Sequence, residues 1–133
     1  MEQPAQVMPM CKVASVDATR DFYVDKLGFD HLMAVVGHDG QLDFCTVIRE
    51  GGRLMFTRAD SGELPPPSAE FYFQVSDVES YREEVSQTGI EVSMPEDMWW
   101  GDRVFILEDV NGYKLWFYQS MRAPEPPEGL KIV

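Results

Sequence analysis

The sequence predicts an α+β fold made of two β-α-β-β-β units. Strand-like apolar alternation and one helical stretch occur in the same order on both sides of a proline-rich segment, residues 59–68. Residues 13–17 are also similar to residues 75–79, at an offset of 62. Because a unit of this size cannot bury both faces of its own sheet, we expect the two units to pack together or on a partner chain.

The first unit, residues 1–58, is predicted to begin with a strand over 7–13. A helix follows, with Ser15 or Asp17 as its N-cap and Gly28 as its terminator. Turn residues then divide the rest of the unit into strands over 29–36, 42–48 and 53–58.

Residues 59–68 are predicted to be a stiff linker, because three consecutive prolines cannot join a sheet interior. In the second unit, residues 69–120, Asp77 is the predicted cap of a helix. Asn111-Gly112 predicts a tight hairpin, since both residues accept positive φ angles. The strands of this unit are predicted over 69–75, 90–93, 104–107 and 113–118. The tail, 121–133, is expected to extend over the surface or pack on a partner.

Composition excludes several classes of protein. The chain has 133 residues, of which 44% are hydrophobic and 12% aromatic, as expected for a globular domain. Its formal charge of −12 argues against nucleic acid as a partner, because phosphate backbones bind basic surfaces. The apolar runs are too short to span a membrane, and the N-terminal residues lack a signal-peptide pattern, so we expect a cytoplasmic protein.

Cysteine and histidine give no strong metal pattern. Cys11 and Cys45 lie in apolar strands and are predicted to be buried thiols. His31 and His38 each follow or precede an aspartate, so a surface metal site there is an alternative to plain solvated side chains.

Three segments together resemble one superfamily. Residues 15–29 resemble the first helix of the vicinal oxygen chelate superfamily, although Ser15 stands where the family usually has aspartate. This superfamily includes glyoxalase I, extradiol dioxygenases, fosfomycin-modifying enzymes and bleomycin resistance proteins. Residues 108–115 are similar to its closing hairpin, and residues 95–101 resemble the preceding loop, best in the bleomycin-resistance branch. The resemblance implies paired modules whose mixed sheets curl around a cleft, commonly in a homodimer.

In the enzymes of this superfamily, one His, Gln or Glu from each of four strands binds a divalent metal in the cleft. The resemblance places these positions at Met8, Met55, Glu70 and Trp116. A thioether is a poor ligand for a hard divalent ion, and indole offers no lone pair. We therefore expect no metal and no other cofactor.

The same inward positions predict a pocket for a planar or cationic organic ligand, with Trp99 and Trp100 in a loop over its mouth. The predicted ligand-binding residues are Met8, Met10, Met55, Glu70, Tyr72, Trp99, Trp100 and Trp116. The function favoured by this pocket is binding and sequestration of a small molecule, without catalysis.

Two alternatives remain open. One is a glyoxalase-type lyase or isomerase, either metal-independent with Glu70 as general base or metal-dependent if the strand register is different. The other is a dimeric module with a filled cleft and no ligand. In that case Glu70 would form a structural ion pair with Lys12 or Arg53.

Overall fold

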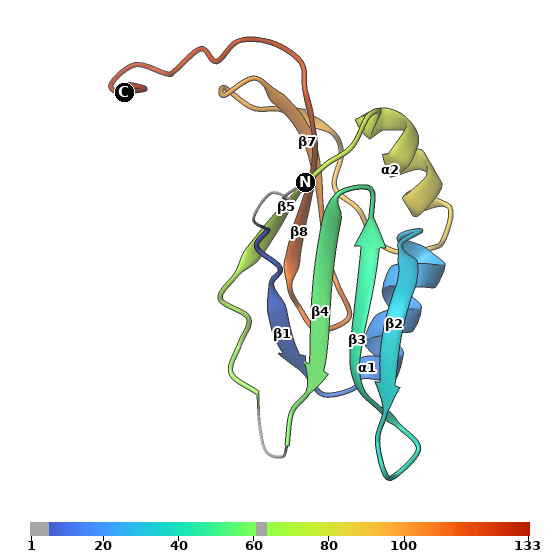
Figure 1. Ribbon diagram of the computed structural model, residues 1–133. Helices are drawn as coiled ribbons and strands as arrows, with labels where there is room; N and C mark the ends of the chain where they lie inside the picture. The colour runs from blue at the N-terminus through green and yellow to red at the C-terminus, as the bar shows by residue number, and fades with distance from the viewer. Residues whose placement is uncertain (1–5, 61–63) are drawn as a thin grey trace, which may run out of the picture. The chain divides into compact units, whose positions relative to one another are not determined.

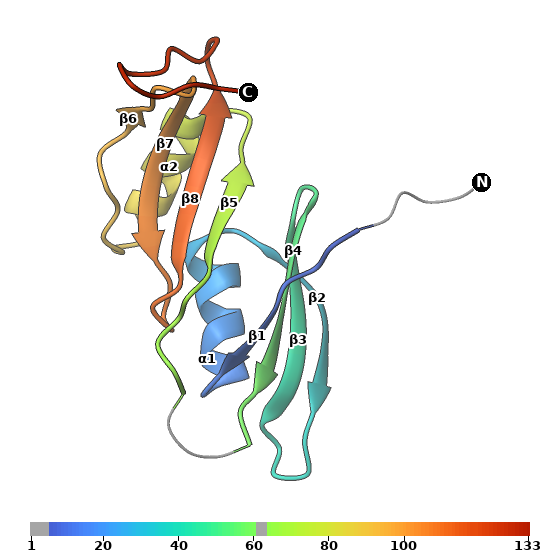
Figure 2. The same ribbon diagram turned by 90° about the vertical axis from the view of Figure 1, so that its left-hand side faces the viewer.

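The computed structural model describes residues 6–60 and 64–133. The chain divides into two compact units, Met1–Pro67 and Ser68–Val133. Each unit contains a mixed four-stranded sheet, and helical segments cover one face of that sheet (Figures 1 and 2). The predicted α+β fold is confirmed.

In the first unit the strand order is β1-β4-β3-β2, and β1 runs parallel to β4 while the other pairs are antiparallel. Its elements are β1 (Met10–Val13), α1 (Val16–Asp21), the π-helical turn η1 (Phe22–Lys26), β2 (Asp30–Val36), β3 (Leu42–Arg49) and β4 (Gly52–Arg58). The first strand is shorter than predicted and begins after Pro9, which has no N–H to donate. The Pro9 carbonyl still accepts a hydrogen bond from the Met55 amide, at 2.9 Å.

Ser15 is the N-cap of α1. Its hydroxyl accepts a 3.1 Å hydrogen bond from the Ala18 amide, so serine performs the capping role at the position where the family usually has aspartate. Asp17, the other predicted cap, instead accepts from the Leu42 amide at 2.9 Å and ties the helix to β3. The helix ends before Gly28 (φ 73°), as predicted, but its last part is η1 rather than continuous α-helix.

The core of the first unit lies between its sheet and its helical segment. Tyr23 is fully buried, with its ring 5.0 Å from that of Phe56 and 5.2 Å from that of Phe29. Cys11 and Cys45 are buried free thiols, as predicted. Burial raises the pKa of the Cys45 thiol to about 11, so this thiol stays protonated at neutral pH.

The second unit repeats this topology with the strand order β5-β8-β7-β6. Its elements are β5 (Glu70–Gln74), α2 (Val78–Ser86), β6 (Glu96–Asp97), β7 (Asp102–Glu108) and β8 (Lys114–Ser120). Asp77 caps α2 as predicted, by accepting from the Ser80 amide at 3.1 Å. The buried Tyr81 of α2 packs its ring 5.0 Å from Phe117 and 5.9 Å from Phe105, so α2 covers one face of β7 and β8.

The strand predicted over 90–93 is wrong, because the edge strand β6 lies further along the chain. Ser93 does donate its amide to the Ile106 carbonyl at 2.9 Å. However, the Ile106 amide is taken by the Ser93 hydroxyl at 2.8 Å instead of a backbone carbonyl. Pro95 has no N–H, so regular pairing begins only at Glu96.

The hairpin between β7 and β8 is present, but the prediction of positive φ at both turn residues is wrong. Gly112 has φ 88°, whereas Glu50 is the only described non-glycine residue with positive φ. Asp109 explains the difference. Its Oδ1 accepts from the amides of Asn111 at 2.8 Å and Tyr113 at 2.9 Å, and this holds the turn in a conformation that needs only one left-handed residue.

The parallel strand pairs β1–β4 and β5–β8 have a similar register in the two sheets. Met10 of β1 lies beside Met55 of β4, and Tyr72 of β5 lies beside Trp116 of β8. Tyr72 follows Met10 by 62 residues, which is the offset that the sequence similarity predicts, and Trp116 follows Met55 by 61 residues.

Candidate ligand-binding site

Aromatic rings gather on the face of β5 and β8 that points away from α2. Alternation along β8 buries Leu115 and Phe117 on the helix side and places Trp116 and Tyr118 on the other side. Tyr72 of β5 stacks on Tyr118 with ring centroids 4.3 Å apart, and its centroid lies 6.0 Å from that of Trp116. Tyr72, Trp100, Trp116 and Tyr118 are named the aromatic face below.

A chain of hydrogen bonds holds Tyr72 and Trp100. The Trp100 indole N–H donates to the Tyr72 hydroxyl oxygen at 2.8 Å, and that hydroxyl donates to Asp102 Oδ2 at 2.6 Å. The Ser120 hydroxyl donates to the other carboxylate oxygen of Asp102 at 3.0 Å. Three strands (β5, β7 and β8) and the turn between β6 and β7 are thereby joined through polar side chains.

The Tyr72 hydroxyl is a persistent hydrogen-bond donor. Its pKa is raised to about 12, first because burial penalises the phenolate and then because the hydroxyl donates to the Asp102 carboxylate. At neutral pH Tyr72 therefore carries no charge, and 44% of the residue's surface remains exposed. The ring is fixed in orientation and still reachable from solvent.

Trp116 is held at its edge and covered on its face. Its indole N–H donates to Glu70 Oε1 at 2.7 Å, and the Lys114 ammonium lies 5.3 Å from the ring centroid. The same Glu70 oxygen is 3.9 Å from Lys114 Nζ. Lys114 is the register neighbour of Glu70 on β8, and the pairing of Glu70 with Lys12 or Arg53 stays a prediction.

Trp99 and Trp100 lie in a short hydrogen-bonded turn, residues 98–101, named the Trp turn. The Met98 amide donates to the Asp102 carbonyl at 2.8 Å, and the Gly101 amide donates to the Met98 carbonyl at 3.0 Å. The two indole rings meet edge to face, with centroids 5.5 Å apart. Trp100 belongs to the aromatic face, whereas Trp99 is 39% exposed beside it.

Two of the three predicted methionines, Met10 and Met55, lie on the first sheet. Met10 and Met55 are neighbours in register, and the row continues across β3 and β2 through Thr46 and Met33. Met8 precedes β1, and Met8, Met10 and Met33 are all exposed. This is the sheet face opposite the buried Cys11 and Phe56 side chains. The role of the methionines in ligand binding stays a prediction.

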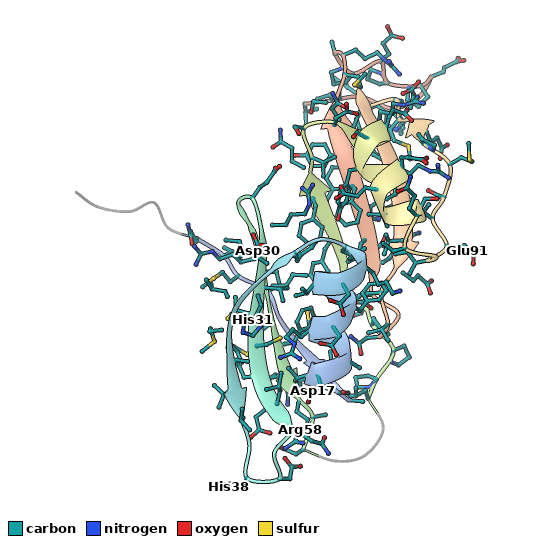
Figure 3. All side chains as sticks on the ribbon, turned by 90° about the vertical axis from the view of Figure 1, so that its right-hand side faces the viewer. Asp17, Asp30, His31, His38, Arg58 and Glu91 are labelled. Atoms are coloured by element: carbon teal, nitrogen blue, oxygen red, sulfur yellow. The ribbon has the colours of Figure 1, made fainter. Side chains whose placement is uncertain are left out.

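The four positions that the sequence resemblance assigns to the metal ligands of the superfamily's enzymes carry side chains that do not fit a divalent metal. They carry two thioethers, one carboxylate and one indole, and the indole nitrogen is a donor to Glu70. Within residues 6–60 and 64–133, no group of three or more His, Cys, Asp or Glu side chains is placed to hold a metal ion. His31 lies exposed on β2 and His38 lies in the turn after it (Figure 3).

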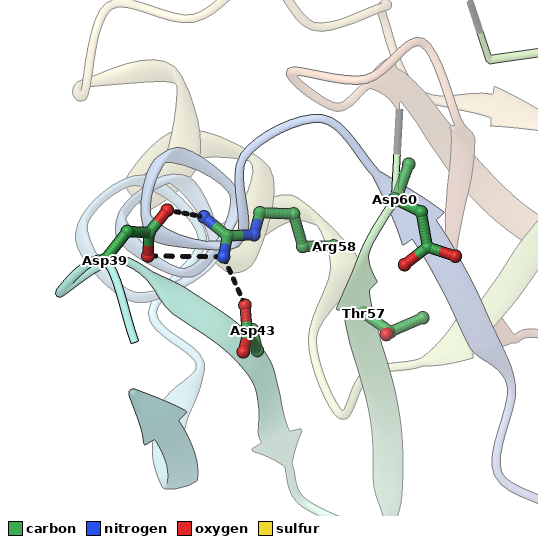
Figure 4. Close-up of a pocket in the computed structure, with 6 residues that line it drawn as sticks. Asp39, Asp43, Thr57, Arg58 and Asp60 are labelled. Carbon is green, nitrogen blue, oxygen red and sulfur yellow. Dashed lines mark hydrogen bonds and ion pairs between the residues drawn. The ribbon is translucent and has the colours of Figure 1, made fainter. Parts of the chain in front are cut away.

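The first unit also has an open polar pocket, lined by Asp39, Asp43, Thr57, Arg58, Ala59 and Asp60 (Figure 4). The Arg58 guanidinium donates to both Asp39 oxygens, at 2.8 and 3.3 Å, and to Asp43. These bonds tie the turn between β2 and β3 to the end of β4. Three of the six lining residues, Asp39, Asp43 and Arg58, are therefore engaged with one another.

The predicted ligand-binding residues do not include three side chains of the aromatic face and its edge, those of Tyr118, Lys114 and Asp102. Tyr118 shares the strand face of Trp116, so period-two alternation was a signal that could have found it. Lys114 lies two positions before Trp116 on the same strand face, so the same alternation could have found it. The bond between Tyr72 and Asp102 had no sequence signal, because the two residues are 30 positions apart.

Residues 8–117 match the family model of the Glyoxalase/Bleomycin resistance protein/Dioxygenase superfamily. The chain belongs to this superfamily. The resemblance inferred from the sequence is thus confirmed over most of the chain. No curated protein sequence matches the chain.

Solved structures with the same fold include proteins that bind antibiotics. TioX from Micromonospora sp. ML1 is 18% identical, with a TM-score of 0.72, and the match covers 89% of this chain and 100% of TioX. A bleomycin-binding protein complexed with bleomycin is 21% identical, with a TM-score of 0.69 and coverage of 87% and 98%. TnmS3, an antibiotic binding protein from Streptomyces sp. CB03234, is 22% identical, with a TM-score of 0.65 and coverage of 90% and 99%.

No helix in the described part of this superfamily member has the length and apolar character needed to cross a membrane.

Proposed function

We propose that this protein binds a planar organic cation on the aromatic face of its second sheet and holds it without changing it chemically. The observation that carries the proposal is the arrangement of Tyr72, Tyr118 and Trp116 as neighbouring rings, with the carboxylates of Glu70 and Asp102 at their edges. Flat rings next to fixed negative charge are the features that recognise an aromatic cation.

Ring geometry favours a planar guest. Each aromatic contact adds about 0.5–1.5 kcal/mol beyond the burial of its area, and a cation over a ring adds about 0.5–1 kcal/mol at an exposed site. The hydrogen bonds from Trp100 to Tyr72 and from Trp116 to Glu70 fix these rings before a ligand arrives. A fixed surface loses less conformational entropy on binding than a mobile one.

Charge favours a cation over an anion. The protein's own Lys114 ammonium already lies over the Trp116 ring and beside Glu70, so a positive group is stable at this position. A ligand cation would replace Lys114 there, and the flexible lysine side chain would move into solvent. The net charge of −12 also raises the local concentration of cations around the protein at low ionic strength.

Structural relatives support binding as the activity. The matching structures include a protein complexed with bleomycin and an antibiotic binding protein. At 21–22% identity these relatives share the fold with this chain. The Met, Met, Glu and Trp side chains at the superfamily's metal positions agree with binding in the absence of metal.

Calorimetric titration with two probes of the same ring size tests the proposal. Acridine orange is a planar three-ring cation, and 9-anthracenecarboxylate is a planar three-ring anion. We expect saturable binding of acridine orange at least tenfold tighter than that of the anion, and recovery of the probe unchanged by mass spectrometry. Equal affinity for both probes, no binding of either, or a chemically altered probe would contradict the proposal.

A further inference from the structure

The segment that directly follows β8 is hydrogen-bonded to the Trp turn. The amides of Met121 and Arg122 both donate to the Gly101 carbonyl, at 2.9 and 3.2 Å. The Glu125 amide donates to the Trp99 carbonyl at 2.7 Å, and the Arg122 guanidinium lies 3.5 Å from Asp97 of β6. Residues 121–125 are named the C-terminal strap.

Gly101 shows how closely the strap approaches the turn. Its φ is +102°, and a Cβ atom built there would lie 2.1 Å from the Arg122 carbonyl oxygen. A backbone oxygen cannot yield as the end of a flexible side chain would. Any residue other than glycine at position 101 must therefore displace the strap or the turn.

The contacts reach the aromatic face from both ends of the turn. The strap fixes the carbonyls on either side of Trp100, and the Trp100 indole then donates to Tyr72. At the other end, Ser120, the residue just before the strap, donates to Asp102, which is the acceptor of the Tyr72 hydroxyl. The family match ends at residue 117, so the strap lies beyond the matched part of the chain.

We infer that the C-terminal strap is a positioning element of the ligand site, which holds Trp100 in the orientation that completes the aromatic face. The inference rests on the proposed function, because it names a determinant of affinity at the same site. It also has a purely structural consequence, which is that the Trp turn loses its fixed conformation when the strap is removed.

Two truncations separate the strap from the rest of the tail. A chain ending at Ser120 loses all three backbone bonds to the turn, whereas a chain ending at Pro126 keeps them and loses only the exposed tip. Amide hydrogen exchange by NMR would follow Met98 and Gly101, which bond within the turn, and Phe117 in the core of β8 as a reference. Titration with acridine orange would follow affinity.

For the chain ending at Ser120 we expect exchange at Met98 and Gly101 to rise at least tenfold, with Phe117 unchanged, and acridine orange affinity to fall at least tenfold. The chain ending at Pro126 should behave as the full chain within twofold. Unchanged turn exchange or unchanged affinity in the shorter chain would overturn the inference. If the full chain binds neither probe, the proposed function fails, and the exchange data alone decide whether the strap holds the turn.

A full-length pair of variants covers the case in which the shorter chain does not fold. Gly101→Ala drives the strap and turn apart without shortening the chain. Gly129→Ala is its matched control, because Gly129 also has a positive φ of 89° but no atom within 4 Å of an added Cβ. We expect the loss of affinity and of turn protection in Gly101→Ala alone. Equal behaviour of the two variants would contradict the role of the strap.

Discussion

The Trp100 indole N–H donates a 2.8 Å hydrogen bond to the hydroxyl oxygen of Tyr72, 28 residues earlier in the chain. Because that hydroxyl also donates to Asp102 at 2.6 Å, Tyr72 links the Trp turn to both β5 and β7. The consequence is an aromatic face whose rings are held by polar bonds as well as by packing.

Trp116→Ala is expected to weaken acridine orange binding by a factor of ten or more, which corresponds to about 1.4 kcal/mol. The substitution removes the ring that Lys114 covers and that Tyr72 neighbours. Trp116→Phe keeps a smaller ring on the same strand face and should lose less affinity. Calorimetry measures both, and unchanged affinity in Trp116→Ala would remove Trp116 from the site.

Lys114→Gln is expected to strengthen acridine orange binding by a factor of two or more and to weaken any binding of 9-anthracenecarboxylate. The lysine ammonium lies over Trp116, where it competes with a cationic guest and attracts an anionic one. Fluorescence titration at low salt measures the change, since exposed charges are screened at high ionic strength.

Lys26→Gln is the control for net charge, because it removes one positive charge from η1, which contributes no residue to the aromatic face. Lys26→Gln should change the affinities for acridine orange and for 9-anthracenecarboxylate only slightly and by equal amounts. A fall in acridine orange affinity in Lys114→Gln would show that the lysine does not occupy the cation position.

Stability of the protein is expected to fall between about pH 10 and about pH 12, and part of this fall should disappear in Tyr72→Phe. The Tyr72 pKa is about 12 in the folded chain, against about 10 for a free tyrosine. In that interval the unfolded chain releases the proton first, so alkali favours unfolding, while below pH 10 the contribution is complete. Urea unfolding across this pH range measures the slope. Equal slopes in both proteins would show that Tyr72 ionises as a solvated phenol.

Asp109→Ala is expected to lower the free energy of unfolding by about 2 kcal/mol, because two backbone amides of the hairpin lose their acceptor. Asp109 is 6% exposed, so water replaces that acceptor poorly. Asp109→Asn keeps an acceptor oxygen in place and should cost less. Urea denaturation measures both variants. Equal losses would mean that the carboxylate charge, and not its acceptor geometry, stabilises the turn.

Local patterns predicted the order of helices and strands in each unit, except for the position of the edge strand in the second unit. Alternation correctly placed Met10 and Cys11 on opposite faces of β1, and the caps Ser15 and Asp77 mark where the helices begin. The edge strand was misplaced because the Ser93 hydroxyl replaces a backbone acceptor, and such a replacement is visible only when the neighbouring strand is known.

The sequence predicted residue types of the site, but not the hydrogen-bond and ion-pair partners of those residues. Alternation placed Tyr72 and Trp116 on the strand faces predicted to line the pocket, and the structure makes them neighbours. The partner of Glu70 depended on strand order, since a parallel β5–β8 pair sets it beside Lys114. The bonds of the strap to Gly101 connect segments whose residues carry no periodic signal.

The most direct test of the proposed site is the detection of intermolecular NOEs between acridine orange and the protein in the NMR spectrum. The account predicts contacts from the acridine ring protons to the ring protons of Trp116 and Tyr72, together with a shifted Trp116 indole N–H resonance. Contacts confined to other residues, with the Trp116 and Tyr72 resonances unmoved at saturation, would contradict it.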